Sequence, residues 1–232
     1  MSALLAIETS TQACSAALLW KGHSYQEISV EPRSHTRLLL PMVDKLLADA
    51  GISPAQLDAI AYTAGPGSFT GLRIGFGVVQ GLAFGCDLPV IGVSTLQTLA
   101  LAAQRELSLS AKTQLLTAFD ARMGEVYWGL YQLESGSVPE AVIDDCLTAP
   151  QQVGQGASDA NLVGVGEGWH LAEQFPLSPQ HVYEGLFPQA VDVLTLASEG
   201  FNNGQAVPVE QAQLTYLRDT VSWKKRQRLR TQ

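Results

Sequence analysis

The stretch LDAIAYTAGPGSFTGLRIGFGVVQGLAFG, residues 57–85, decides the fold of the first half of the chain. Its opening apolar run predicts a buried strand over residues 59–63, and the glycine–proline cluster behind it predicts a tight turn over 64–67. The remainder predicts a helix over residues 68–84. The sequence therefore places a strand, a sharp turn and a long helix in direct succession.

The turn has two interpretations. Pro66 fixes its own φ, while Gly65 and Gly67 tolerate positive φ, so the chain can reverse here without strain. Ser68 or Thr70 can cap the helix, whose first N–H groups then point into the turn and form an anion site. The alternative is a tight turn without a ligand. No lysine follows the glycines, so the pattern is not a P-loop.

The helix is unusually rich in glycine. Gly71 and Gly75 are four residues apart, and Gly77, Gly81 and Gly85 follow at the same spacing. Each interior glycine costs a helix about 1 kcal/mol relative to alanine, so several of them indicate that another element approaches the backbone closely. That element is either the chain's own sheet or a helix of a partner, and both interpretations stay open.

A second helix is predicted over residues 35–50, with Ser34 as N-cap, Gly51 after its last residue, and Pro41 as a kink or late start. Its apolar residues spread over about 200° of the helical wheel, whereas a surface helix packed on one sheet needs roughly half of that. We therefore expect this helix and the glycine-rich helix to contact both their own sheet and another chain. The residues expected at this partner surface are Leu38, Leu39, Met42, Val43, Leu46, Gly71, Arg73, Ile74, Gly75 and Val78.

The remaining apolar runs predict two lobes built alike. Residues 3–7, 16–20 and 25–30 predict three antiparallel strands joined by turns, and helices follow them. Strands over residues 114–119 and 125–132 repeat the strand–turn–strand arrangement. Three antiparallel strands at the very beginning argue against a simple Rossmann order.

We expect the N-terminal lobe to span residues 1–107, completed by a C-terminal helix over about 214–232. The C-terminal lobe then spans residues 108–213. Residues 134–161 are mixed in character, and the proline-containing stretch 171–189 is expected to be a loop.

Composition excludes several classes of protein. The chain has 232 residues, of which 46% are hydrophobic and 16% charged, so it can bury a sizeable core. Its net charge of −8 argues against a nucleic-acid binder that acts alone. Three cysteines without a C-x-x-C pattern indicate neither a disulfide framework nor a zinc site. We find no signal peptide and no apolar run that approaches 18 residues, and we expect a cytoplasmic protein.

Few residues are placed for catalysis. Glu8 and Asp120 are acids at strand ends, where acid–base or magnesium chemistry is expected, although such acids are commonly turn formers. Arg73 and Arg122 are candidate anion partners or interface charges. The candidate anion or nucleotide contacts are Gly65, Gly67, Ser68, Glu8 and Asp120. The four histidines are scattered and form no metal motif. These residues alone do not define a reaction.

Five segments carry a resemblance to a known family. They are AIETSTQACSAALL at 6–19, SHTRLLLPMVDKLL at 34–47, AYTAGPGSFTGLRIG at 61–75, FDARMGEVYWGLY at 119–131 and YLRDTVSWKK at 216–225. Together they resemble the TsaB (YeaZ) family, whose α/β fold is the two-lobed actin/Hsp70/sugar-kinase fold with mixed sheets flanked by helices. The resemblance is weak between about 134 and 190.

The resemblance implies a role in tRNA modification. The family supplies the non-catalytic member of the machinery that transfers threonylcarbamoyl to N6 of the adenosine adjacent to the tRNA anticodon. Its paralogue TsaD performs the transfer, and the ATPase TsaE binds across the pair. Family members form homodimers, and heterodimers with TsaD, through the helices that correspond to residues 34–50 and 70–84. The resemblance implies contact with tRNA only within the complex, ATP and magnesium only in the assembled complex, and no metal or cofactor on this chain alone.

The chain also departs from the paralogue. The resemblance places the paralogue's metal-binding His-x-x-x-His pair at about Thr95 and Leu99, and neither residue is a histidine. We therefore expect that this chain binds no metal at that site and acts as a scaffold. An alternative is a stand-alone enzyme that uses ATP and magnesium between Glu8 and Asp120 in the interlobe cleft. A third hypothesis is that the homodimer itself acts as a protease-like or regulatory protein.

Overall fold

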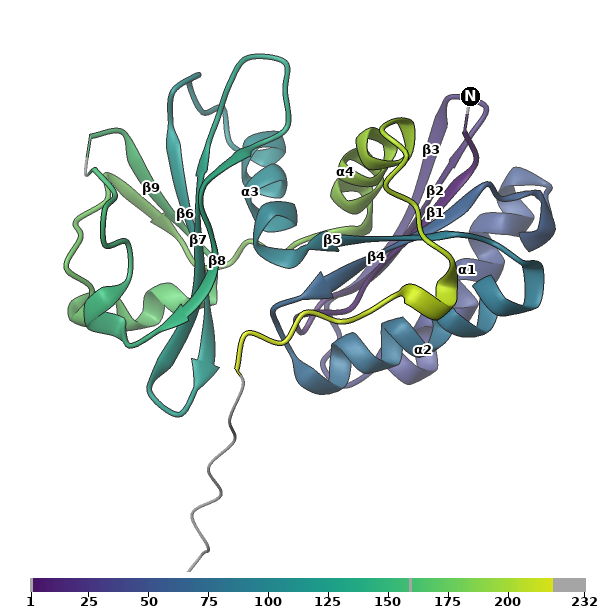
Figure 1. Ribbon diagram of the computed structural model, residues 1–232, viewed down its shortest axis with the longest axis horizontal. Helices are drawn as coiled ribbons and strands as arrows, with labels where there is room; N and C mark the ends of the chain where they lie inside the picture. The colour runs from purple at the N-terminus through teal and green to yellow at the C-terminus, as the bar shows by residue number, and fades with distance from the viewer. Residues whose placement is uncertain (1, 159, 219–232) are drawn as a thin grey trace, which may run out of the picture.

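The computed structural model describes residues 2–158 and 160–218, which form two lobes side by side (Figure 1). The first lobe contains a five-stranded sheet in the order β3-β2-β1-β4-β5. β1 pairs antiparallel with β2 and parallel with β4, and β5 continues the parallel side. Its strands are β1 (Leu4–Glu8), β2 (Cys14–Trp20), β3 (His23–Ser29), β4 (Ala59–Gly65) and β5 (Val90–Ser94).

The second lobe repeats this topology. Its five-stranded sheet has the order β10-β9-β6-β7-β8, in which β6 pairs antiparallel with β7 and parallel with β9. Its strands are β6 (Gln114–Arg122), β7 (Glu125–Gln132), β8 (Glu140–Thr148), β9 (Leu162–Val165) and β10 (His181–Tyr183). The duplicated mixed sheets confirm the expected actin/Hsp70/sugar-kinase architecture. β8 and β10 lie in stretches where no strand was predicted.

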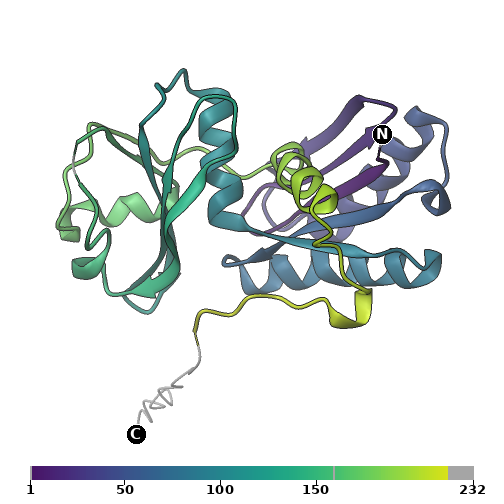
Figure 2. The ribbon, with the colours of Figure 1, turned by 45° about the horizontal axis from the view of Figure 1, so that its top comes forward.

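Helices cover both faces of the first sheet. α1 (His35–Ala50) and α2 (Phe69–Cys86) lie on one face, and α4 (Ala190–Asn202) lies on the other (Figures 1 and 2). The side chains of β1 alternate between these layers, because Leu5 and Ile7 pack toward α1 and α2 while Leu4 and Ala6 pack toward α4. All five residues of β1 are buried, as expected for a strand covered on both sides.

The second sheet is covered on one face by α3 (Thr95–Glu106). Leu96, Leu99 and Ala103 of this helix are fully buried against β6, β7 and β9. Trp169 and Phe175 pack on the opposite face. The 3-10 helices are η1 (Pro54–Gln56), η2 (Pro150–Gln152), η3 (Glu167–Gln174) and η4 (Val209–Gln211).

The lobe boundaries differ from those expected at residues 107 and 213. α3 was assigned to the first lobe but packs in the core of the second, and α4 packs on the first sheet although it was assigned to the second lobe. The expected helix over 214–232 is wrong for residues 214–218, which are not helical, and its remainder lies outside the described residues. The lobe to which α3 and α4 belong is set by packing against strands that are distant in the sequence, so it does not follow the order of the chain.

The helix bounds follow the local signals. α1 begins and ends where predicted, and Gly51 after it adopts φ 67°, the left-handed conformation that favours glycine. The Ser34 side chain does not cap α1, because its hydroxyl instead donates a hydrogen bond of 2.6 Å to the carbonyl of Glu31. Pro41 lies inside the helix and is exposed.

α2 is longer than expected. Its 18 residues have the length and apolar composition of a membrane-crossing helix, so the prediction that no apolar run approaches 18 residues is wrong here. By itself one such helix is weak evidence for a membrane span, since core helices of water-soluble proteins meet the same criterion.

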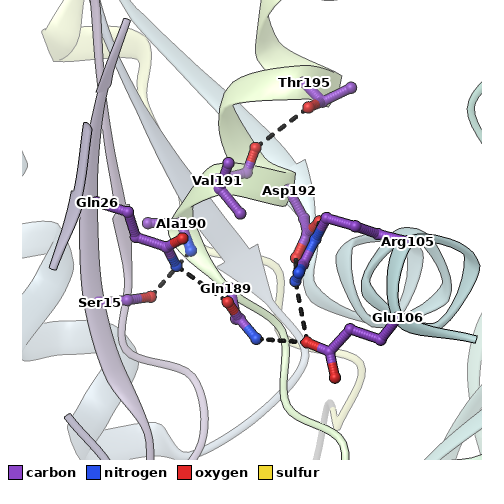
Figure 3. A network of polar contacts seen from close by, with 9 residues as sticks. All are labelled: Ser15, Gln26, Arg105, Glu106, Gln189, Ala190, Val191, Asp192 and Thr195. Carbon is purple, nitrogen blue, oxygen red and sulfur yellow. Dashed lines mark hydrogen bonds and ion pairs between the residues drawn. The ribbon is translucent and has the colours of Figure 1, made fainter. Parts of the chain in front are cut away.

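A polar network joins the two lobes where α3 meets α4 (Figure 3). Arg105 at the end of α3 donates two hydrogen bonds, of 2.8 and 3.0 Å, to the buried carboxylate of Asp192 in the first turn of α4. Glu106 accepts a 2.7 Å hydrogen bond from Gln189, which in turn accepts one of 3.0 Å from Gln26 of β3. These contacts fix the ends of both helices and tie the second lobe to the first sheet.

Candidate functional site

A cleft of about 950 Å³ lies between the lobes. Its walls come from the turn after β1, the start of α2, the β6–β7 hairpin and the end of the described chain. The residues that matter for its chemistry are Ser10, Thr11, Gln12, Arg33, Gly67, Ser68, Phe69, Asp120, Arg122, Tyr127, Glu167, Thr215, Tyr216 and Arg218. Hydroxyl groups and arginines thus face a space large enough for a small ligand.

The turn before α2 already uses part of its hydrogen-bonding capacity. Ser68 caps α2 as predicted, since its side chain accepts a 3.2 Å hydrogen bond from the Gly71 amide. The Ser68 amide donates a 2.7 Å hydrogen bond to the Ser10 carbonyl. A Cβ on Gly67 would lie 2.7 Å from that same oxygen. Internal oxygens therefore occupy two of the amides that an anion would use, which weakens the anion interpretation.

Gly65 has a different role from the one expected. Its φ of +120° requires glycine, and a Cβ there would lie 2.7 Å from the Thr215 carbonyl. It is followed by a cis peptide bond to Pro66. Gly65 therefore gives room to the C-terminal segment and does not line the cleft.

Glu8 is enclosed beneath the turn after β1. Its side chain is fully buried, and one carboxylate oxygen accepts hydrogen bonds from the amide and hydroxyl of Ser10 and, at 3.2 Å, from Thr63. Burial raises the pKa of Glu8 from 4.5 to about 7, although these hydrogen bonds lower it. The second oxygen has no partner among the described residues. A proton on that oxygen fits this environment better than a charge.

Asp120 lines the cleft but is paired. Its carboxylate accepts a 2.7 Å hydrogen bond from the Arg122 amide and forms a 2.8 Å ion pair with the Arg122 guanidinium. Glu8 does not line the cleft, so the structure does not bring the two acids into one site. Residues 2–158 and 160–218 contain no group of three or more His, Cys, Asp or Glu side chains that could hold a metal ion. The expected magnesium site between Glu8 and Asp120 therefore does not fit the residues present.

The glycines of α2 separate into two groups. A Cβ on Gly71 would meet the Thr9 carbonyl, and one on Gly75 would meet the Thr9 hydroxyl, both closer than van der Waals contact allows. Gly77, Gly81 and Gly85 have nothing within 4 Å of such a Cβ. The first pair thus serves close packing inside the chain, while the other three form an open stripe on the surface.

The expected partner surface divides in the same way. Leu39, Met42, Val43 and Leu46 are buried in the core of the first lobe, so they cannot contact a partner directly. Gly71 and Gly75 are buried as well. The broad apolar arc of α1 covers its own sheet and α2. Of the predicted residues, four reach the surface: Arg73 is exposed, and Leu38, Ile74 and Val78 are half-buried.

Thr95 and Leu99, where the resemblance led us to expect the positions of the paralogue's metal ligands, lie inside the protein. Thr95 is the first residue of α3, Leu99 lies one turn later, and both are 0% exposed. The sequence analysis missed the part played by Tyr216 and Arg218 in the cleft wall. Their position in the last quoted motif was the available signal.

Comparison with known proteins shows which family this sequence and fold belong to. The family model described as TsaD, tRNA N6-adenosine threonylcarbamoyltransferase, matches residues 29–189. The tRNA threonylcarbamoyladenosine biosynthesis protein TsaB of Escherichia coli K12 is 42% identical, over 96% of this chain and 97% of that protein. The chain belongs to the TsaB family. The TsaB of Haemophilus influenzae is 37% identical, over 96% of both chains. YeaZ from Pseudomonas aeruginosa has a TM-score of 0.88 and 45% identity to this TsaB-family chain, covering 94% of it and all of YeaZ.

Proposed function

We propose that this chain is a non-catalytic scaffold subunit in the synthesis of threonylcarbamoyladenosine in tRNA. In this role it pairs with TsaD, works with the ATPase TsaE, and meets tRNA only as part of the complex. ATP and magnesium act in the assembled complex and not on this chain alone. The observation that carries the proposal is the similarity, over nearly the full length of the chain, to proteins named for threonylcarbamoyladenosine biosynthesis. In addition, the two candidate catalytic acids of this chain, Glu8 and Asp120, do not line the same cleft.

The pairing surface is proposed on the open side of α2. Gly77, Gly81 and Gly85 repeat every four residues, so they share one helix face and allow a partner helix to approach the backbone. Phe84 beside them is 68% exposed, which is high for a large apolar side chain on a free surface. Leu40 of α1 is 48% exposed. The same face would serve a homodimer and a heterodimer with TsaD.

The test of the proposed function is a purified modification reaction. Formation of threonylcarbamoyladenosine is measured on a tRNA with TsaD, TsaE and the threonylcarbamoyl donor, with this chain present or omitted. We expect modification to stop when the chain is omitted. Undiminished modification without it would contradict the scaffold role.

Gly81→Leu is expected to weaken pairing with TsaD at least about tenfold, or about 1.4 kcal/mol, because the side chain fills the space needed for close helix approach. The fold should stay intact, since open space surrounds the Gly81 Cβ position and leucine favours helix more than glycine does. Titration calorimetry with TsaD measures the affinity.

Gly185→Leu is the matched control, because Gly185 also has open space around it but lies in the second lobe, away from α2. Equal affinities for the two variants would rule out the glycine stripe as the pairing surface. The modification assay would remain informative in that case, because a scaffold can pair through another face.

The alternative of a stand-alone enzyme using ATP and magnesium has less support. It relied on Glu8 and Asp120 acting together, and Glu8 is enclosed in the first lobe while Asp120 is paired with Arg122. The cleft remains a candidate ligand site by size alone.

A further inference from the structure

The chain after α4 crosses from one lobe to the other. It returns along the edge of the first sheet, where Val207 and Val90 exchange hydrogen bonds of 3.0 and 2.8 Å. Gln213 then accepts a 3.0 Å hydrogen bond from the Tyr62 hydroxyl, and the Thr215 amide donates one of 2.7 Å to Ala64. Figures 1 and 2 show this segment passing beneath the gap between the lobes, along the side of α2.

Tyr216 attaches the segment to the start of α2. Its hydroxyl accepts a 3.1 Å hydrogen bond from Nε of Arg73, and its ring lies 6.0 Å from the ring of Phe69. The Arg73 guanidinium stacks on Phe69, 3.5 Å from the ring centroid. Such stacking holds a long flexible side chain in one orientation. The anchor on the first lobe therefore combines backbone, ring and guanidinium contacts.

Arg218 makes the contact with the second lobe. Its guanidinium donates hydrogen bonds to a Glu125 carboxylate oxygen at 2.5 Å, to the Arg122 carbonyl at 3.2 Å and to the Met123 sulfur at 3.5 Å. All three acceptors belong to the β6–β7 hairpin, in which Arg122, Met123 and Gly124 have φ of 63°, 60° and 79°. Two consecutive non-glycine residues at positive φ are uncommon. Arg218 thus binds a hairpin that also forms part of the cleft wall.

A second connection joins the lobes on the other side of the cleft. There α3 and α4 are held by the Arg105–Asp192 pair and by the Glu106–Gln189 hydrogen bond (Figure 3). Figure 1 shows these helices above the gap and the C-terminal segment below it. A rotation of the lobes about α3 and α4 would pull Arg218 away from its acceptors.

We propose that residues 213–218 form a clasp that sets the width of the interlobe cleft, with the α3–α4 contacts as its hinge. The Arg218 and Glu125 side chains are 17% and 39% exposed, whereas those of the Arg37–Glu31 pair within the first lobe are 63% and 58% exposed. Water and salt screen a partly buried pair less than an exposed one. Closing the clasp therefore restrains the lobes, and opening it requires Arg218 to leave three acceptors together.

The test measures the distance between the lobes directly. Spin labels are attached at Ser24→Cys in β3 and Gln155→Cys in the second lobe, both exposed positions, with Cys86 and Cys146 replaced by serine. Cys14 is fully buried and is kept. Pulsed electron paramagnetic resonance then gives the distribution of label distances. Arg218→Ala breaks the clasp. Arg37→Ala is the matched control, because it also removes an arginine from an ion pair, but that pair lies within the first lobe.

We expect Arg218→Ala and Glu125→Ala to broaden the distance distribution to a similar extent, and Arg37→Ala to leave it unchanged. Arg218→Lys should give an intermediate width, because lysine keeps the charge but loses the fork that reaches the hairpin carbonyl. Circular dichroism confirms that each variant is folded. The clasp is refuted if the Arg218→Ala distribution superimposes on that of Arg37→Ala. This outcome is independent of the tRNA reaction, so it leaves the proposed function untouched.

Discussion

Glu8→Gln is expected to remove about 3 kcal/mol of pH dependence from the free energy of unfolding, since each unit of pKa difference is worth about 1.4 kcal/mol. The folded chain holds the Glu8 proton up to about pH 7, whereas the unfolded chain releases it near 4.5. Between these values the folded state binds more protons, so the stability from this group is complete below pH 4.5 and is lost as pH rises through 7. Glutamine stays neutral and mimics the protonated acid.

The measurement is urea unfolding of both proteins at several pH values from 4.5 to 8.5. The difference between the two profiles cancels the contributions of all other groups, so the variant should gain stability over the parent as pH rises. Glu31→Gln serves as control, because Glu31 is an exposed carboxylate paired with Arg37. Parallel profiles for the parent and Glu8→Gln would show that Glu8 is already ionised in the folded protein.

Gly75→Leu is expected to destabilise the fold by about 3 kcal/mol or more, because even a Cβ at this position meets the Thr9 side chain. Thr9 itself is 2% exposed and lies between β1 and β2, so it has little room to move. In a chain of this size the midpoint of thermal unfolding should fall by roughly 6 to 12 °C. Differential scanning calorimetry measures that shift.

The same substitution at Gly81 provides the contrast, since it adds the same atoms to the same helix with open space around them. Its thermal midpoint should equal or exceed that of the parent. A Gly75→Leu protein as stable as Gly81→Leu would show that α2 can move away from the β1–β2 turn. It follows that Gly75→Leu cannot test partner binding cleanly, because it damages the fold first.

The sequence alone could have distinguished the two groups of glycines, because the two groups lie on different faces of α2. Gly71 and Gly75 continue at four-residue spacing into Val79 and Ala83, which are buried, so this row marks the inner face of α2. The row that includes Gly81 has a charged residue, Arg73, before its three glycines and no buried apolar residue. Local rules of this kind predicted most of α1, α2 and the first strands, because capping and periodicity depend on near neighbours.

Other features depend on contacts between distant parts of the chain. The enclosure of Glu8 depends in part on Thr63 of β4, which is 55 residues away and donates a hydrogen bond to the Glu8 carboxylate, and the residues near Glu8 in the sequence do not indicate that contact. The wide apolar arc of α1 was interpreted as a partner surface, although one lobe can bury it against a sheet and a second helix. Neither the crossing of α4 to the first lobe nor the contacts of Arg218 is visible in local periodicity.

The position of α4 on the first sheet has a consequence during synthesis on the ribosome. β5 ends at Ser94, but α4, which covers the outer face of that sheet, begins only at Ala190. At bacterial elongation rates this interval lasts roughly 5 to 20 s. Throughout it Leu4 and Ile91 lack their covering helix, which makes the nascent chain a client for chaperones that bind exposed apolar segments. For the same reason, a recombinant fragment that ends near residue 107 should aggregate.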